Sequence, residues 1–118
     1  MWQRIVNWFK RLFSHQAPVH RENNGLWWQQ TDNNRVKVGL DSKVIDELGG
    51  DITFLETPQV DEDIKKADQL IDIEGGKAVE TFKSPVTGKI SKVYEGYQDD
   101  PTTLTKAQNP LLVEITTA

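Results

Sequence analysis

Residues 71–82 read IDIEGGKAVETF, and this stretch decides how the rest of the chain is interpreted. Apolar and polar residues alternate before the two glycines, so we expect Ile71 and Ile73 to face a core. The pair Gly75-Gly76 permits the positive φ angles that a two-residue hairpin turn needs. The stretch therefore predicts a β-hairpin that displays Lys77 at its tip, in water.

An exposed lysine at a turn has two interpretations. It can be a soluble surface residue with no further role, which is common at hairpin tips. It can also be held out so that another enzyme modifies it covalently. The hairpin alone does not distinguish these two interpretations, so the surrounding sequence must be considered.

The chain on both sides of the hairpin consists of short strand-like segments separated by glycine and proline turns. LWWQQ (26–30) and RVKVGL (35–40) flank a turn near residues 32–34, and LLVEIT (111–116) forms a closing strand. The polar stretch 97–110 is expected to be a loop. This pattern predicts a mainly β domain over residues 26–118, a small sandwich or barrel.

One short helix is expected inside this domain. In DSKVIDELGG (41–50), Asp41 or Ser42 can cap the amino-terminal end. Gly49-Gly50 can terminate the helix.

Composition limits the chemistry of the chain. Its 118 residues contain no cysteine, which excludes a disulfide, a thiolate nucleophile and a cysteine-based zinc site. The only histidines, His15 and His20, lie in a polar stretch, and no metal site is expected. No combination of nucleophile, base and pocket indicates an enzyme. Residues 23–118 carry ten Lys and Arg against seventeen Asp and Glu, which argues against binding to nucleic acid.

The amino-terminal segment MWQRIVNWFKRLFSH (1–15) has a different character. Its apolar residues fall on one helical stripe, which predicts a basic amphipathic helix too short to cross a bilayer. Residues 2–13 could dock on a membrane surface or on a protein partner, pack on the chain's own domain, or serve as an organelle-targeting peptide. Residues 16–25 are expected to be a polar linker.

Several ordered motifs resemble one known family. They are RVKVGL (35–40), DELGGDITFLETPQVDEDI (46–64), IEGGKAV (73–79) with Glu74 three residues before Lys77, and Gly88 in SPVTGKI (84–90). On these motifs the chain from about Trp27 to Ile115 resembles the lipoyl-carrier proteins, and among them the H protein of the glycine cleavage system.

The resemblance implies a flattened barrel-sandwich hybrid of two small sheets with the modified lysine at a hairpin tip. It implies lipoate as the cofactor, joined by an amide to Lys77, so that a cysteine-free chain obtains its disulfide chemistry from the attached group. Glu74 would help a ligase recognise the hairpin, or would be a solvated charge. Biotin carriers usually place methionines on both sides of the lysine, whereas Lys77 lies between Gly76 and Ala78.

The resemblance also implies partners: a lipoate ligase or lipoyl transferase, and lipoate-dependent enzymes such as those of glycine cleavage or of a lipoyl relay. The acidic residues 61–63, with Asp68 and Asp72, form either a surface that partners read or a solvated acidic face. We expect a cytoplasmic location, with peripheral membrane attachment and organelle targeting left open.

The sequence departs from the family pattern at several positions. Gly75 and Gly76 replace the family's serine and valine, Asp61 replaces a glycine, and residues 48–51 contain one extra glycine. The family's carboxy-terminal helix has no counterpart, and the amino-terminal helix is an addition. These departures favour a short H-protein-like carrier.

The expected function is that of a carrier, not a catalyst. Lipoate on Lys77 would pass acyl or aminomethyl groups, electrons or the lipoyl group itself between partner enzymes. The alternative is an adaptor that has kept the fold and lost the modification. Its amino-terminal helix would then dock on a membrane or a protein.

Overall fold

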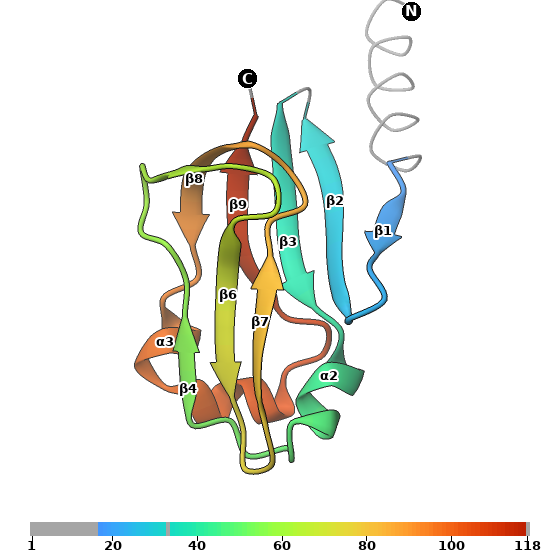
Figure 1. Ribbon diagram of the computed structural model, residues 1–118, viewed down its shortest axis with the longest axis vertical. Helices are drawn as coiled ribbons and strands as arrows, with labels where there is room; N and C mark the ends of the chain where they lie inside the picture. The colour runs from blue at the N-terminus through green and yellow to red at the C-terminus, as the bar shows by residue number, and fades with distance from the viewer. Residues whose placement is uncertain (1–16, 33, 118) are drawn as a thin grey trace, which may run out of the picture.

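The computed structural model describes residues 17–32 and 34–117, and these residues form a mainly β fold (Figure 1). One antiparallel sheet has six strands in the order β1-β2-β3-β9-β8-β5, and the other has three in the order β4-β6-β7. The strands of the larger sheet are β1 (Val19–Arg21), β2 (Leu26–Asp32), β3 (Arg35–Leu40), β5 (Asp63–Ile64), β8 (Gly88–Val93) and β9 (Leu111–Thr116). Those of the smaller sheet are β4 (Phe54–Glu56), β6 (Gln69–Glu74) and β7 (Val79–Lys83).

A single apolar core fills the space between the two sheets. The larger sheet contributes Val38 and Ile115, and the smaller sheet contributes Ile71, Ile73 and Phe82, all at most 1% exposed. The predicted inward direction of Ile71 and Ile73 is thus confirmed. Leu70 is buried beside Ile71 because a register shift between Gln69 and Ile71 interrupts the alternation. The expected fold of two small sheets is confirmed.

The predicted helix is also confirmed, as α2 (Ser42–Glu47). The Asp41 side chain accepts a hydrogen bond from the Lys43 N–H at 3.0 Å, so Asp41 is the amino-terminal cap. At the other end the Gly49 N–H donates to the Asp46 carbonyl and the Gly50 N–H to the Ile45 carbonyl. This pair of bonds is a Schellman motif, and the positive φ angles of Gly49 (107°) and Gly50 (72°) make it possible.

Two stretches expected to be irregular contain regular structure. The polar stretch 97–110, expected to be a loop, contains most of α3 (Gly96–Asp99) and the 3-10 helix η1 (Pro101–Lys106). Leu104 lies at 0% exposure within it and anchors these short helices on the core. The expected linker 16–25 contains β1, which pairs with β2 and stacks His20 on Trp28 at 4.1 Å. In both cases tertiary packing outweighs a polar local composition.

The predicted amphipathic helix over residues 1–15 lies outside the described residues. Within the described ranges, no helix is long and apolar enough to cross a bilayer.

Candidate functional site

Lys77 lies where the sequence places it, in the connection between β6 and β7 at one end of the molecule (Figure 1). Glu74 pairs with Val79, so four residues rather than two form the connection. The Gly75 N–H donates to the Ala78 carbonyl at 2.9 Å and closes the loop. Neither Gly75 nor Gly76 has a positive φ, so the expectation of a two-residue turn built on positive φ angles is wrong.

The hairpin tip is fixed to the end of helix α2. The Lys77 backbone N–H donates a hydrogen bond to the Leu48 carbonyl at 3.0 Å. The Schellman motif satisfies the carbonyls of Ile45 and Asp46, which leaves the Leu48 carbonyl to accept from outside the helix. Leu48 itself is buried at 3% exposure, so the tip is tied to a residue of the core.

This close contact leaves little room for a Cβ atom at two glycines. A Cβ atom on Gly75 would lie 2.3 Å from the Leu48 carbonyl oxygen, and one on Gly49 would lie 3.0 Å from the Lys77 nitrogen. A Cβ atom on Gly76 would meet nothing within 4 Å. Gly75 therefore permits the approach of hairpin to helix, whereas Gly76 has no such constraint.

The side chains of Lys77 and Glu74 are both exposed. Among the described residues, neither the Lys77 ammonium nor the Glu74 carboxylate has a hydrogen bond or ion pair, and they do not pair with each other. Glu74 contributes through its backbone, because its carbonyl accepts from the Thr53 N–H at 2.9 Å. The backbone of the hairpin is thus held on both sides, while the Lys77 side chain has no partner among the described residues.

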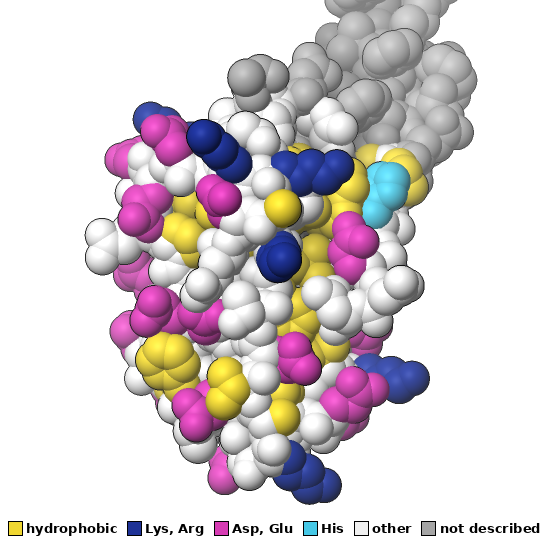
Figure 2. All heavy atoms as spheres, viewed as in Figure 1, with side chains coloured by type: hydrophobic (Ala, Val, Ile, Leu, Met, Phe, Trp, Pro, Cys, Tyr) yellow, Lys and Arg dark blue, Asp and Glu magenta, His cyan; other side chains and the backbone are white. Residues whose placement is uncertain are grey.

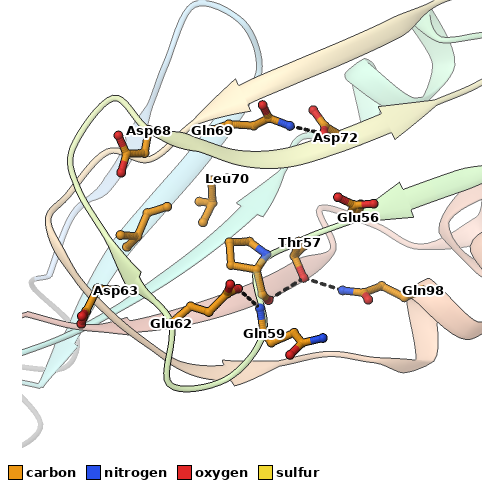
Figure 3. A pocket seen from close by; sticks show the side chains of 12 residues that line it. Glu56, Thr57, Gln59, Glu62, Asp63, Asp68, Gln69, Leu70, Asp72 and Gln98 are labelled. Atoms are coloured by element: carbon orange, nitrogen blue, oxygen red, sulfur yellow. Dashed lines mark hydrogen bonds between the residues drawn. The ribbon is translucent and has the colours of Figure 1, made fainter.

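Four of the five acidic residues singled out in the sequence gather at a groove beside β6 (Figure 3). Its volume is about 670 Å³, and Glu62, Asp63, Asp68 and Asp72 line it together with Glu56. Asp61 does not line this groove.

Most of these carboxylates stabilise local structure. Asp68 accepts from the Lys65 N–H at 2.9 Å, and Glu62 accepts from the Gln59 N–H. Asp72 accepts from the Thr81 hydroxyl at 2.7 Å and from the Gln69 amide. Within the described part of the chain, no cluster of three or more His, Asp or Glu residues could hold a metal ion. The role of these acids in partner recognition stays a prediction.

Sequence reasoning missed the contact between α2 and the hairpin. Gly49-Gly50 was interpreted only as a helix terminator, although the second glycine is one more than the family pattern has. The glycine pair was the available signal, since its first member, Gly49, lies against the Lys77 backbone. The structure also explains a second departure from the family pattern. Asp61, which replaces a family glycine, has φ 76°, a left-handed conformation that aspartate tolerates better than most residues.

The chain is similar to known proteins over most of its length. A family model described as "Glycine cleavage H-protein" matches residues 19–111. The glycine cleavage system H protein of Listeria monocytogenes strain HCC23 is 38% identical over 74 residues, which are 63% of this chain and 58% of that protein. The probable glycine cleavage system H protein of Thermococcus kodakarensis is 37% identical over 75 residues, 64% of this chain and 55% of the relative. The matches therefore span a little over half the length of these relatives.

The fold has a solved counterpart. The crystal structure of a glycine cleavage system H protein from Mycobacterium marinum superposes with a TM-score of 0.75 at 22% identity, covering 86% of this chain and 85% of that one. At this identity the match shows the fold alone.

Proposed function

Because the chain belongs to the glycine cleavage H-protein family, we propose that it is a lipoyl carrier whose lipoate is attached to Lys77. The observation that carries this proposal is the position of Lys77. It is an exposed amine, engaged by no other described side chain, on a backbone that the Leu48 carbonyl fixes to the core. Once attached, the lipoyl group supplies a dithiolane that accepts and releases electrons and transferred groups.

The residues of the chain do the positioning. The Leu48–Lys77 hydrogen bond and the Gly75–Ala78 hydrogen bond hold the backbone of the tip, so an enzyme meets a hairpin that is already ordered. The unprotonated Lys77 amine would attack the carboxyl carbon of activated lipoate. The amide C–N bond forms as the bond from that carbon to the activating group breaks; the activating group leaves with the electron pair, and the nitrogen loses a proton. Water surrounds this side chain, so the modifying enzyme must provide the proton acceptor and the dry pocket.

The proposed partners follow from this role. A lipoate ligase or lipoyl transferase would modify Lys77, and lipoate-dependent enzymes of glycine cleavage or of a lipoyl relay would use the loaded chain. Glu74 would support recognition by the modifying enzyme, since its carboxylate lies at the end of β6 with no partner among the described residues. The chain would thus be a substrate and carrier for enzymes.

An intact-mass measurement tests the proposal. The full chain is incubated with lipoate, ATP and a lipoate ligase that modifies a known lipoyl domain in parallel. We expect a gain of one lipoyl group that peptide mapping assigns to Lys77. Lys77→Arg should abolish the gain, whereas Lys83→Arg, at an exposed lysine of the same hairpin, should leave it unchanged. An unmodified wild-type chain beside a modified control domain would refute the proposal.

We also infer that residues 2–13 dock the carrier on a membrane surface or a protein partner. The support is the sequence alone: one apolar stripe flanked by Arg4, Lys10 and Arg11. The wild-type chain and a variant with all three basic residues changed to glutamine are each mixed with vesicles of neutral and of partly anionic lipid. Retention on the anionic vesicles that is lost in the variant supports docking on a membrane. Equal retention of the wild type and the variant excludes it.

A further inference from the structure

Two large apolar side chains stay in water beside the Lys77 tip. Phe54 is 43% exposed on β4 and Val79 is 64% exposed on β7. Both are opposite Glu74 of β6 in the register of the smaller sheet, Phe54 on one side and Val79 on the other. Directly opposed residues of antiparallel strands project from the same side of a sheet, so the three side chains form one row on the outer face.

The core confirms the direction of this row. The next residues along the strands, Leu55 and Ile73, are opposed to each other and buried at 5% and 0% exposure. Phe54 and Glu74 therefore point away from the core. Figure 2 shows exposed apolar side chains among acidic ones near the hairpin end of this face.

The outer face next to the tip is acidic as well as apolar. The row behind Phe54, Glu74 and Val79 consists of Glu56, Asp72 and Thr81. These two rows carry three carboxylates and no lysine or arginine. Among described residues, Glu56 and Glu74 have no hydrogen bond or ion pair, so both charges are available to a cationic partner.

We propose that this outer face, centred on Phe54, Glu74 and Val79, is the docking surface for the enzyme that attaches lipoate to Lys77. That enzyme would offer an apolar pocket flanked by arginine or lysine. The inference rests on the proposed function. The modifying enzyme must bring the Lys77 amine itself into its active site, so it has to cover the base of the hairpin. An enzyme that uses the loaded carrier reaches only the end of a long arm and can leave this face open.

The test compares lipoylation rates of full-chain variants with one ligase, lipoate and ATP. Phe54→Thr combined with Val79→Thr removes the exposed apolar groups and keeps residues suited to strands. We expect its kcat/KM to fall about tenfold or more, the size of loss typical of central interface residues. The matched control is Val19→Thr with Val60→Thr, two valines each 46% exposed elsewhere, which should keep the wild-type rate.

Variants that remove a charge provide an independent test. Glu74→Gln should lower kcat/KM and flatten its decrease with added salt, because a screened attraction has been removed. Glu80→Gln removes a charge from the same hairpin at a position opposite Ile73, on the other side of the sheet, and should leave the salt dependence unchanged. Circular dichroism of each variant checks that the fold is kept.

The outcomes are separable from those of the proposed function. No modification of the wild-type chain overturns the function itself. Normal modification of the wild type together with an unchanged rate for the folded Phe54/Val79 double variant overturns the docking surface alone. A double variant that is lipoylated normally but is used poorly by a lipoate-dependent enzyme would assign the face to that enzyme, and also overturns this inference.

Discussion

The Leu48 carbonyl oxygen accepts a hydrogen bond from the Lys77 backbone N–H at 3.0 Å, so the end of a helix holds the tip of a hairpin. Hairpin tips usually have few contacts and open easily. Here the tip is tied to a buried residue of the core, while the Lys77 side chain is exposed. A rigid backbone under an exposed amine fits the proposed role of Lys77 as the residue that a modifying enzyme recognises.

The two glycines before Lys77 should respond differently to substitution. Gly75→Ala places a methyl group 2.3 Å from the Leu48 carbonyl, so the hairpin has to move away from α2. We expect a loss of about 1–3 kcal/mol of stability, as for other overpacked sites, and slower lipoylation. Gly76→Ala meets open space at a φ that is not positive, so stability should hold or rise by about 0.4–1 kcal/mol.

Urea unfolding followed by tryptophan fluorescence measures both effects on stability. Equal losses for the two variants would show that Gly75 has no special contact with the helix.

The glycines after α2 form a second matched pair. Gly49→Ala combines a strained φ of 107° with a methyl group 3.0 Å from the Lys77 nitrogen, whereas Gly50→Ala has a φ of 72° and no atom within 4 Å. Both should destabilise, by about 1–3 kcal/mol for a non-glycine residue in such a conformation. Only Gly49→Ala should also slow lipoylation, since only Gly49 touches the tip.

Rates measured at a temperature where both variants are folded make this comparison. A Gly50→Ala chain that is lipoylated as slowly as Gly49→Ala would mean that the helix end acts through overall stability alone.

Variants at the amino-terminal cap of α2 can separate the contribution of charge to stability from that of hydrogen bonding. The Asp41 carboxylate accepts from the Lys43 N–H and also pairs with Arg21 at 3.0 Å. Asp41→Ala removes both interactions and should cost about 0.5–2 kcal/mol, typical of a lost cap. Asp41→Asn keeps an oxygen that can cap the helix and should cost about 0.2–1 kcal/mol, because the Arg21 pair is solvent-exposed.

Thermal unfolding in low and high salt distinguishes the two variants. If Asp41→Asn is as damaging as Asp41→Ala, the ion pair rather than the cap stabilises this end of the helix.

Local sequence patterns predicted most elements of the fold. The features that were not predicted depend on contacts between residues far apart in the sequence. The alternation around Ile71 and Ile73 and the capping signals at Asp41 and Gly49 are properties of neighbouring residues, so they could be predicted from the sequence. The helical turns around Leu104 form because the core accepts that side chain, which a polar local sequence does not indicate. The same holds for Leu48 and Lys77, whose contact depends on how α2 packs against the hairpin.

The exposed row of Phe54, Glu74 and Val79 illustrates the same limit. Each residue could be assigned to a strand, but only the pairing of β4, β6 and β7 brings the three side chains together. The left-handed conformation of Asp61 is another case. A glycine in the family pattern marked the position, and the structure supplies the φ of 76° that explains it.

The larger sheet contains a carboxylate that should affect how the stability of the chain changes at alkaline pH. Glu114 is 7% exposed, and its carboxylate accepts a hydrogen bond from the Tyr94 hydroxyl at 2.6 Å. Burial, the hydrogen bond to Glu114 and the negative charge of Glu114 together raise the pKa of Tyr94 from 10.0 to about 12. The folded chain therefore holds this proton more tightly than the unfolded chain does.

The sign of the pH effect follows from this difference. The stabilisation is fully present below pH 10, where both states are protonated, and is lost as the pH rises from 10 to about 12 because the unfolded state ionises first. Tyr94→Phe should remove this part of the alkaline decline. It should also lower stability near pH 7 by about 1–3 kcal/mol, since the buried Glu114 carboxylate loses a donor.

Ultraviolet absorbance of ionised tyrosine, recorded during a pH titration, measures the pKa of Tyr94 directly. Tyr94→Phe and Tyr97→Phe assign the two tyrosine transitions. Glu114→Gln should lower the pKa of Tyr94 and still leave it above 10, because burial, the largest cause, remains. A Tyr94 transition near pH 10 in the wild-type chain would contradict the coupling to Glu114. An unchanged transition in Glu114→Gln would assign the whole shift to burial.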